Sequence, residues 1–90
     1  MLKFKNTKTF RNDLKRILKS GKDVNKFKEV AEKLINEVPL ERKYLDHKLV
    51  GRYKGQRECH LEPDWLLIYY IKNDTVTFVR TGTHTELFKK

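Results

Sequence analysis

The residues best able to do chemistry lie in the second half of the chain: His47, His60, His84, Asp64 and Arg80. Histidine titrates near neutral pH and can act as a base or an acid, each role contributing about 10²- to 10⁴-fold in rate. Arginine stays cationic and can fork onto a phosphate as negative charge builds up. This set suits cleavage of RNA, because the ribose 2′-hydroxyl is a built-in nucleophile and the protein need supply only proton transfer and charge stabilisation.

A zinc site is the alternative for three histidines, since three imidazoles can hold that metal. The histidines are spaced by 13 and 24 residues, which matches no familiar ligand pattern. Positive neighbours such as Arg57 and Arg80 would also disfavour a cation. We therefore expect neither a metal nor a cofactor.

Four further side chains form the predicted substrate-binding set. Trp65 and Phe88 could stack on unpaired bases. Simple packing is the alternative for both aromatic residues. The basic side chains Lys54 and Arg57 complete the set.

The charge of the chain favours a polyanionic partner. Twenty-one Lys plus Arg stand against twelve Asp plus Glu in 90 residues, which gives a net charge of +9. The excess is concentrated in residues 1–33, with eleven basic residues against four acids. Neutralising phosphates releases condensed counterions and so favours binding. A merely solvated basic surface is the alternative.

The cysteine count and the hydropathy indicate the compartment. Cys59 is the only cysteine, so no internal disulfide can form and nothing points to an oxidising environment. It lies in a predicted strand, where a thiol is usually a small buried hydrophobe. No apolar leader opens the chain and no run approaches the roughly 20 residues that cross a bilayer. We expect a cytoplasmic protein that does not contact membranes.

The N-terminal elements follow from the hydrophobic pattern. Alternation over residues 2–5 predicts a short strand with one buried face. Two stripes at helical spacing then predict two helices, capped by Thr7 or Thr9 and by Asp23. Gly21 lies where a left-handed helix end favours glycine. The short link between the stripes predicts an antiparallel helical hairpin.

The pattern of the C-terminal half predicts a sheet. Residues 57–62, 65–71 and 75–81 are predicted strands, joined by turns at Pro63-Asp64 and Asn73-Asp74.

Less regular segments flank these strands. Residues 39–46 show no periodicity, 49–53 could begin a strand, and 83–88 could form one helical turn.

A register prediction follows if both turns have two residues. His60 then lies opposite Leu67, and Leu67 opposite Arg80, so His60 and Arg80 share one open face about 10 Å apart. His84 continues the same side. The open face would hold Glu58, His60, Glu62, Trp65, Leu67, Tyr69, Phe78 and Arg80. The helices would cover Cys59, Leu61, Leu66, Ile68, Tyr70 and Val79.

Three ordered motifs carry a family resemblance. They are Asp46-His47-x-Leu49-x-Gly51, Arg57-Glu58-x-His60-x-x-Pro63-Asp64-Trp65, and Arg80-Thr81-Gly82-Thr83-His84 followed by Glu86-Leu87-Phe88. In these motifs the chain resembles the YafQ toxins of the RelE/ParE superfamily of bacterial toxin–antitoxin systems. The resemblance implies one α+β toxin domain over residues 1–90, with an N-terminal strand and a two-helix hairpin packed on one face of a small twisted antiparallel sheet.

The resemblance also implies a function and partners. YafQ toxins are ribosome-dependent endoribonucleases that cut mRNA within the A site and halt translation. The three histidines and Asp64 fall on active-site positions, Arg80 on the phosphate-stabilising arginine, and Trp65 and Phe88 on positions important for activity. An acidic antitoxin would mask the site, and operator DNA would be bound only together with that antitoxin.

Two other functions remain open at this point. A ParE-like gyrase inhibitor would have the same fold without catalysis, and it gives no reason for the grouped histidines. A non-catalytic RNA-binding module would depend on the basic helices alone. Among the histidines, the roles of base and acid also stay open.

Overall fold

The computed structural model describes residues 1–88. The strands are β1 (Lys3–Asn6), β2 (His47–Lys48), β3 (Arg57–Glu62), β4 (Trp65–Lys72) and β5 (Thr75–Gly82). The α-helices are α1 (Lys8–Lys19), α2 (Val24–Ile35) and α3 (His84–Phe88), and two short 3₁₀ turns are η1 (Arg42–Tyr44) and η2 (Gly51–Tyr53). In the described part of the chain, no helix is long and apolar enough to span a membrane.

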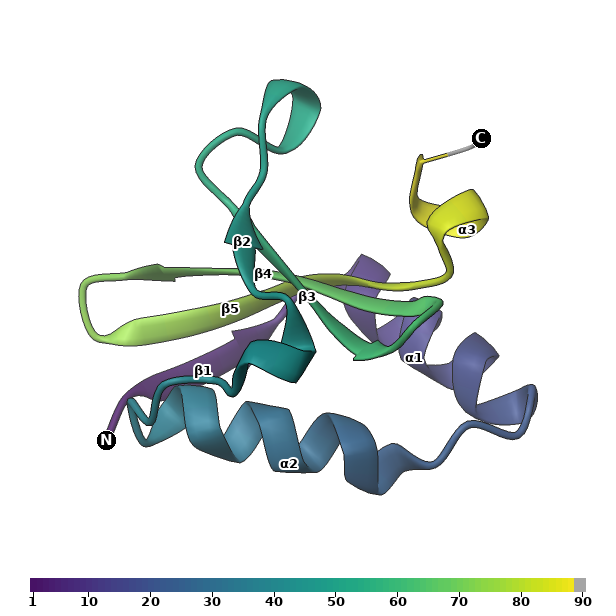
Figure 1. The fold of residues 1–90 in the computed structure, drawn as a ribbon, viewed down its shortest axis with the longest axis horizontal. Coiled ribbons are helices and arrows are strands. Elements are labelled where there is room, and N and C mark those ends of the chain that lie inside the picture. Colours follow the sequence, from purple (N-terminus) through teal and green to yellow (C-terminus); the bar gives the residue numbers. More distant parts are fainter. Residues whose placement is uncertain (89–90) are drawn as a thin grey trace.

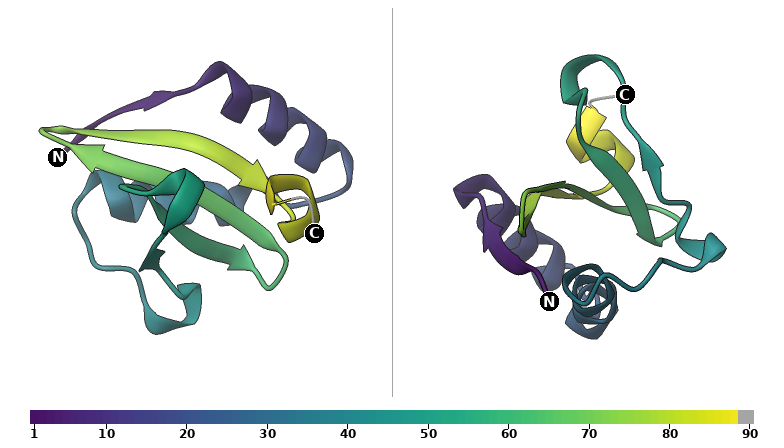
Figure 2. Two further views of the ribbon diagram at one scale, coloured as in Figure 1. Left: turned by 90° about the horizontal axis from the view of Figure 1, so that it is seen from above. Right: turned by 90° about the vertical axis from the view of Figure 1, so that its left-hand side faces the viewer.

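The sheet has the strand order β1-β5-β4-β3-β2. Its neighbours are antiparallel except for β1, which runs parallel to β5 at one edge. Figures 1 and 2 show α1 and α2 on one side of the sheet, with α3 and the loop containing η2 on the other. The predicted α+β fold, with the strand and two helices packed on a small sheet, is confirmed.

Local signals start and end the helices as predicted. The Thr7 hydroxyl accepts a hydrogen bond from the backbone N–H of Phe10, and the Asp23 carboxylate accepts one from Asn25, both at 2.9 Å. These side chains satisfy N–H groups that have no partner within the helix. Gly21 has a φ of +99°, the left-handed conformation expected of it.

The main core lies between the sheet and the two long helices. Phe10 of α1, Phe27 of α2 and Phe78 of β5 form a cluster with ring centroids 5.2 to 5.6 Å apart. Cys59 is fully buried there, and burial raises the pKa of its thiol. The prediction of a small buried hydrophobe at this position is confirmed.

The turn between β3 and β4 has two residues, but a bulge follows it. Glu62 pairs with Trp65, as a two-residue turn requires. An irregularity between His60 and Glu62 then shifts the register, so that His60 pairs with Leu66. The predicted pairing of His60 with Leu67 is therefore wrong, because one extra residue stands in β3.

A second bulge lies between β4 and β5. The two-residue turn is confirmed by the pairing of Lys72 with Thr75. An irregularity farther along the pair makes Arg80 the partner of Ile68 instead of Leu67. His60 and Arg80 thus lie in neighbouring rows, not in one row.

The bulges reverse the two faces predicted for β4, but His60 and Arg80 still share one face of the sheet. The core between the sheet and the helices contains Trp65, Leu67 and Tyr69. The prediction had placed Leu66 and Ile68 there, and these two residues lie on the other face of the sheet. Phe78 and Glu62 were also expected on the open face and lie on the helix side, with Phe78 in the core. Val79 instead packs with Leu66 and Ile68, against Tyr53 and Leu87. His60 and Arg80 pair with Leu66 and Ile68, so both belong to the open face.

Three smaller predictions need correction. The strand β1 has no buried face, and Phe4 is 60% exposed. The segment 49–53 contains η2 instead of a strand start, and the strand β2 lies just before it. The connection 39–46 includes η1, whose Tyr44 is buried. The single helical turn predicted over residues 83–88 is present as α3.

Candidate active site

The three histidines converge on the open side of the sheet, although they come from three elements. His60 lies near the end of β3, His47 in the edge strand β2, and His84 at the start of α3. The ring centroid of His60 is 6.4 Å from that of His47 and 5.6 Å from that of His84. Groups this close can act on neighbouring atoms of one bound molecule.

A buried carboxylate joins two of these rings. Glu58 Oε1 lies 3.4 Å from Nε2 of His47 and 3.4 Å from Nε2 of His60. The Glu58 side chain is only 7% exposed. Its place two residues before His60 on one strand puts both on the same face, and that spacing was the available sequence signal. The predicted site did not include Glu58.

The Nδ1 atom of His47 lies 2.7 Å from the carbonyl oxygen of Leu45. A carbonyl oxygen can only accept, so this contact requires a proton on Nδ1. The Glu58 carboxylate, also an acceptor, faces Nε2 of the same ring. Both ring nitrogens of His47 therefore face acceptor oxygens.

Asp64 orients His84 through two contacts. One carboxylate oxygen lies 2.6 Å from His84 Nδ1, and the same oxygen accepts the His84 backbone N–H at 2.9 Å. The backbone hydrogen bond, followed by the ring contact, lowers the pKa of Asp64. Since a carboxylate accepts, Nδ1 is the donor in the ring contact, and Nε2 takes no part in it.

Arg80 is held by a second buried carboxylate, that of Asp13 in α1. Arg80 donates from Nε to Asp13 Oδ2 at 2.8 Å and from Nη2 to Oδ1 at 3.0 Å. The hydrogen bond with Asp13 is the main reason that the pKa of Arg80 lies above its ordinary value. The guanidinium therefore stays charged and fixed along one edge. No sequence signal singled out Asp13, because a charged residue in an amphipathic helix is usually expected on the face exposed to solvent.

The expectation that Trp65 stacks on a base is wrong for this structure. Trp65 is 0% exposed and lies in the core. Its indole N–H donates to the Thr81 hydroxyl at 2.8 Å, and that hydroxyl donates to the Leu66 carbonyl. Phe88 is partly buried, with its ring 5.9 Å from that of Tyr53 in an edge-to-face contact. Phe88 thus packs on the open face of the sheet, whereas Trp65 packs on the face that the helices cover.

Arg57 is engaged in an internal network. It donates to the Asp46 carboxylate from Nη2 at 2.9 Å and from Nε at 3.2 Å. The Tyr69 hydroxyl donates to the same carboxylate at 2.6 Å. Burial, with a smaller contribution from Asp46, raises the pKa of Tyr69. This network anchors the residue that precedes His47.

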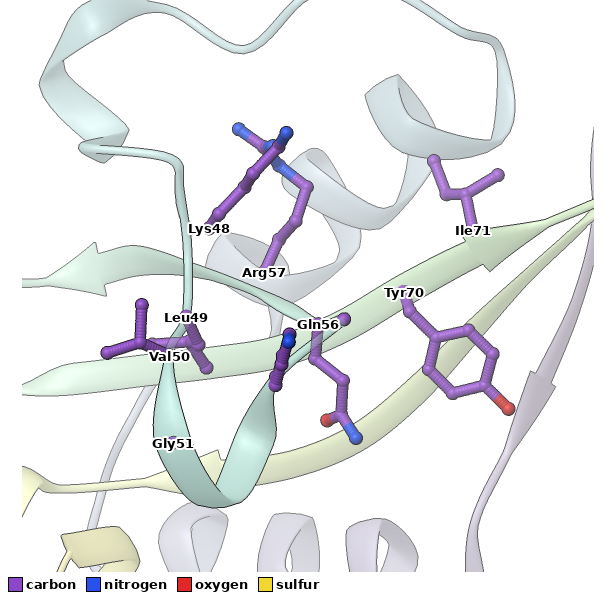
Figure 3. A pocket seen from close by; sticks show the side chains of 10 residues that line it. Lys48, Leu49, Val50, Gly51, Gln56, Arg57, Tyr70 and Ile71 are labelled. Atoms are coloured by element: carbon purple, nitrogen blue, oxygen red, sulfur yellow. The ribbon is translucent and has the colours of Figure 1, made fainter.

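Lys54 and Arg57 line a pocket of about 690 Å³ that is separate from the histidines. Figure 3 shows its walls, which come from the segment around η2 and from the adjoining parts of β3 and β4. A pocket of about 490 Å³ does adjoin the site, since His60 is one of its lining residues. The structure therefore groups the three histidines with Asp64 and sets Lys54 and Arg57 apart from them.

No group of three or more His, Cys, Asp or Glu side chains within residues 1–88 has the arrangement needed to hold a metal ion. The rings of His47 and His60 both turn Nε2 toward the same carboxylate, and His84 turns Nδ1 toward Asp64. Each of these three rings therefore has one nitrogen facing a carboxylate oxygen.

Comparison with known proteins agrees with the motifs. The family described as "Bacterial toxin of type II toxin-antitoxin system, YafQ" matches residues 2–89. An mRNA interferase toxin YafQ of Escherichia coli (strain K12) is 46% identical over 80 residues, covering 88% of this chain and 87% of that protein.

Solved structures agree in fold. The E. coli DinJ-YafQ complex contains a chain with a TM-score of 0.90 at 42% identity, covering 98% of this chain and 99% of that one. A metal-bound toxin from Helicobacter pylori has a TM-score of 0.91 at 47% identity, covering 98% of this chain and 100% of that one.

Proposed function

This chain belongs to the YafQ family of bacterial type II toxin–antitoxin toxins, and we propose that it is an endoribonuclease that stops translation by cutting mRNA in the ribosomal A site. The proposal treats residues 1–90 as one toxin domain acting in the cytoplasm. Its relative of known activity is named an mRNA interferase and matches most of both chains. The grouping of three histidines with Arg80 on one face supports the same chemistry.

The proposed reaction is an internal transfer at phosphorus that uses no metal. The ribose 2′-oxygen attacks the adjacent phosphorus and its proton goes to a base. The bond from phosphorus to the 5′-oxygen breaks, and an acid supplies a proton to that leaving oxygen. The products are a 2′,3′-cyclic phosphate and a 5′-hydroxyl end. Arg80 binds the phosphate oxygens, where negative charge builds up.

The contacts of the histidines support specific roles. His84 is the proposed base, because Asp64 takes its Nδ1 side and leaves Nε2 to accept the 2′-hydroxyl proton. His47 is the proposed acid, because both of its nitrogens face acceptors. His60 lies between the two rings and completes the site. The Asp64–His84 contact is the observation on which this assignment rests.

The proposed partners follow from the family. The E. coli relative is found in a complex with DinJ. An acidic antitoxin that covers this basic chain is the corresponding partner, and operator DNA would be bound only in that complex. The ribosome positions the mRNA, and held geometry can be worth several powers of ten in rate.

Mapping of mRNA 5′ ends after induction in cells tests the function. The expected result is new 5′-hydroxyl ends inside coding regions with wild-type protein. Loss of those ends with His84→Ala, at unchanged folding by circular dichroism, supports the assignment. DNA damage signalling without new mRNA ends would instead support a gyrase inhibitor.

Cleavage rates of a modified mRNA on purified ribosomes separate base from acid. Replacing the 5′-oxygen of the scissile bond by sulfur gives a leaving group that needs no proton. His47→Ala should then recover most of its lost rate with purified ribosomes, whereas His84→Ala should not. Equal recovery by both variants would remove the assigned roles.

A further inference from the structure

We infer that Asp13 is a positioning residue for catalysis, whose carboxylate fixes the guanidinium of Arg80 so that its other end faces the scissile phosphate. Asp13 would act through Arg80 and touch no substrate itself. This inference rests on the proposed function, because it assumes that Arg80 binds the reacting phosphate.

The surroundings of Asp13 are built around its charge. The residue is only 2% exposed, although it lies on a helix that is mostly solvated. Its two oxygens receive Arg80 at 2.8 and 3.0 Å, Arg16 at 3.1 Å and the Thr81 backbone N–H at 3.3 Å. Burial opposes ionisation, yet these donors outweigh it and hold the pKa of Asp13 below its ordinary value.

Packing alone gives no reason for a carboxylate at this position. A buried ion pair often adds no stability compared with apolar side chains of similar volume. The neighbouring buried residues of α1, Phe10 and Ile17, are apolar and fill the same core. The arrangement is explained if the charge serves to hold Arg80 in one orientation.

The geometry of the contact matches that role. Asp13 takes the Nε and Nη2 edge of the guanidinium, and Tyr53 also interacts with this side chain. Nη1 takes no part in the contacts with Asp13 and is the end that can face a phosphate. An arginine fork held along one edge has fewer orientations to lose when it binds. A displacement of about 1 Å at such a group can cost about 10²-fold in rate.

Asp13 is also linked to the element that carries His84. Arg16 donates to Asp13 and, through Nε, to Glu86 at 2.9 Å. Glu86 in turn accepts the backbone N–H of Thr83 at 2.9 Å, next to His84. One series of ion pairs thus runs from the arginine that binds phosphate to the helix that carries the proposed base.

Kinetics on mRNA-programmed ribosomes test the inference. Asp13→Asn should lower the maximal cleavage rate by about 10- to 100-fold and leave the half-saturating ribosome concentration nearly unchanged. Arg80→Ala should lose more, and adding Asp13→Asn to Arg80→Ala should cost less than threefold further. Asp23→Asn is the matched control, since it removes an exposed carboxylate that caps α2, and it should keep the wild-type rate.

A spectroscopic readout reports the contact directly. In ¹⁵N-labelled protein carrying His84→Ala, which avoids toxicity, the Nε–H signal of Arg80 should be resolved and exchange slowly. Asp13→Asn should broaden or remove that signal and leave the amide spectrum otherwise folded. An unchanged Arg80 signal would overturn the inference.

A second variant covers the case in which Asp13→Asn does not fold. Asp13→Glu keeps the charge and moves the carboxylate by one methylene, so about a tenfold loss of rate is expected in a folded protein. A wild-type rate in either Asp13 variant overturns the positioning role and leaves the proposed function intact. A wild-type rate in Arg80→Ala overturns the role of Arg80 in the proposed function, and the inference with it.

Discussion

The Glu58 carboxylate contacts both His47 and His60, at 3.4 Å from each Nε2. Glu58→Gln keeps the shape but replaces a double acceptor by an amide that also donates. The neutral amide oxygen can still face both rings but attracts them less strongly than a carboxylate does. We therefore expect the cleavage rate to fall by about 10- to 100-fold, as for other residues that orient a catalytic group. Single-turnover cleavage on programmed ribosomes measures this. Glu32→Gln, an exposed change on α2, is the control, and equal rates for both variants would contradict the prediction.

We expect Trp65 to affect activity only through stability, because its ring is buried and its N–H donates to the Thr81 hydroxyl. Trp65→Phe removes this hydrogen bond and leaves unfilled volume, which should lower the free energy of unfolding by about 1 to 3 kcal/mol. Urea unfolding measures the loss. The cleavage rate of the folded fraction should stay within threefold of the wild-type rate. A tenfold lower rate at full folding would restore a direct role for this ring.

The residue types that do chemistry could be predicted from the sequence, as could the carboxylate Asp64, but the supporting carboxylates Asp13 and Glu58 were missed. Histidine and arginine are informative wherever they occur, since their chemistry is specific. Asp13 and Glu58 are informative only through their partners. Asp13 meets Arg80 across 67 positions of sequence, and that contact exists only after α1 packs on the sheet.

At the scale of elements, the strands and turns were predictable and the bulges were not. Residues 65–71 are almost all apolar, so alternation does not decide which face of β4 is buried. The register then depended on counting from two turns, and each flanking strand contains one extra residue. Each bulge shifts one flanking strand by one residue relative to β4. His60 and Arg80 therefore pair with Leu66 and Ile68, which lie on one face of β4, and the prediction that the two site residues share a face still holds.

The start of α3 depends on close packing at Gly82. A Cβ at this position would lie 2.8 Å from Glu86 Oε1 and 3.4 Å from Leu87 Cδ2. Gly82→Ala should therefore push the Glu86 carboxylate away from the Thr83 N–H that it accepts, loosen the start of α3 at His84, and lower the cleavage rate by at least tenfold. Gly21→Ala is the matched control, because a Cβ there meets no atom within 4 Å but is strained at a φ of +99°. Unfolding and cleavage assays on both variants check this.

Both variants should lose about 1 kcal/mol of stability, since a non-glycine residue at either backbone conformation is disfavoured. Only Gly82→Ala should lose activity beyond that effect. An equal fall in cleavage rate for Gly21→Ala would show that stability, and not the position of α3, is responsible.

The ion pair between Asp13 of α1 and Arg80 of β5 should make the free energy of unfolding depend on pH. The folded-state pKa of Asp13 lies below its ordinary value of 3.8. Its stabilising effect is therefore complete above about pH 4 and is lost as the pH falls through the lower folded-state value. Asp13→Asn, which resembles the protonated acid, should be clearly less stable than wild type at pH 7. The gap should narrow steadily below pH 4. Urea unfolding at pH 7, 5 and 3 measures it, and a constant gap would contradict the linkage.

For the whole molecule, the excess charge was predictable but its distribution was not. Several lysines that raise the count are paired with acids, such as Lys22 and Lys26 with Glu62 and Lys33 with Glu41. The lysines at positions 15 and 19 are exposed and make no ion pair within residues 1–88. They lie on α1, the helix whose Asp13 and Arg16 reach the site. Lys15 and Lys19 are four residues apart, so they form a short row of two basic side chains on the exposed surface of α1.

This row should act as a phosphate contact when the toxin binds its target. The double variant Lys15→Gln and Lys19→Gln should weaken binding to mRNA-programmed ribosomes and reduce the slope of log K against log salt by about 1 per lost phosphate contact. Lys3→Gln with Lys33→Gln removes the same charge from lysines paired with Asp74 and Glu41, and is the matched control. Fluorescence anisotropy of labelled protein in the His84→Ala background measures binding from roughly 50 to 300 mM salt, a range over which the screening length shortens markedly. Because the control leaves α1 intact, its slope should change by less than half as much. Equal slopes for the two double variants would mean that net charge alone governs the association, and that α1 has no special place in it.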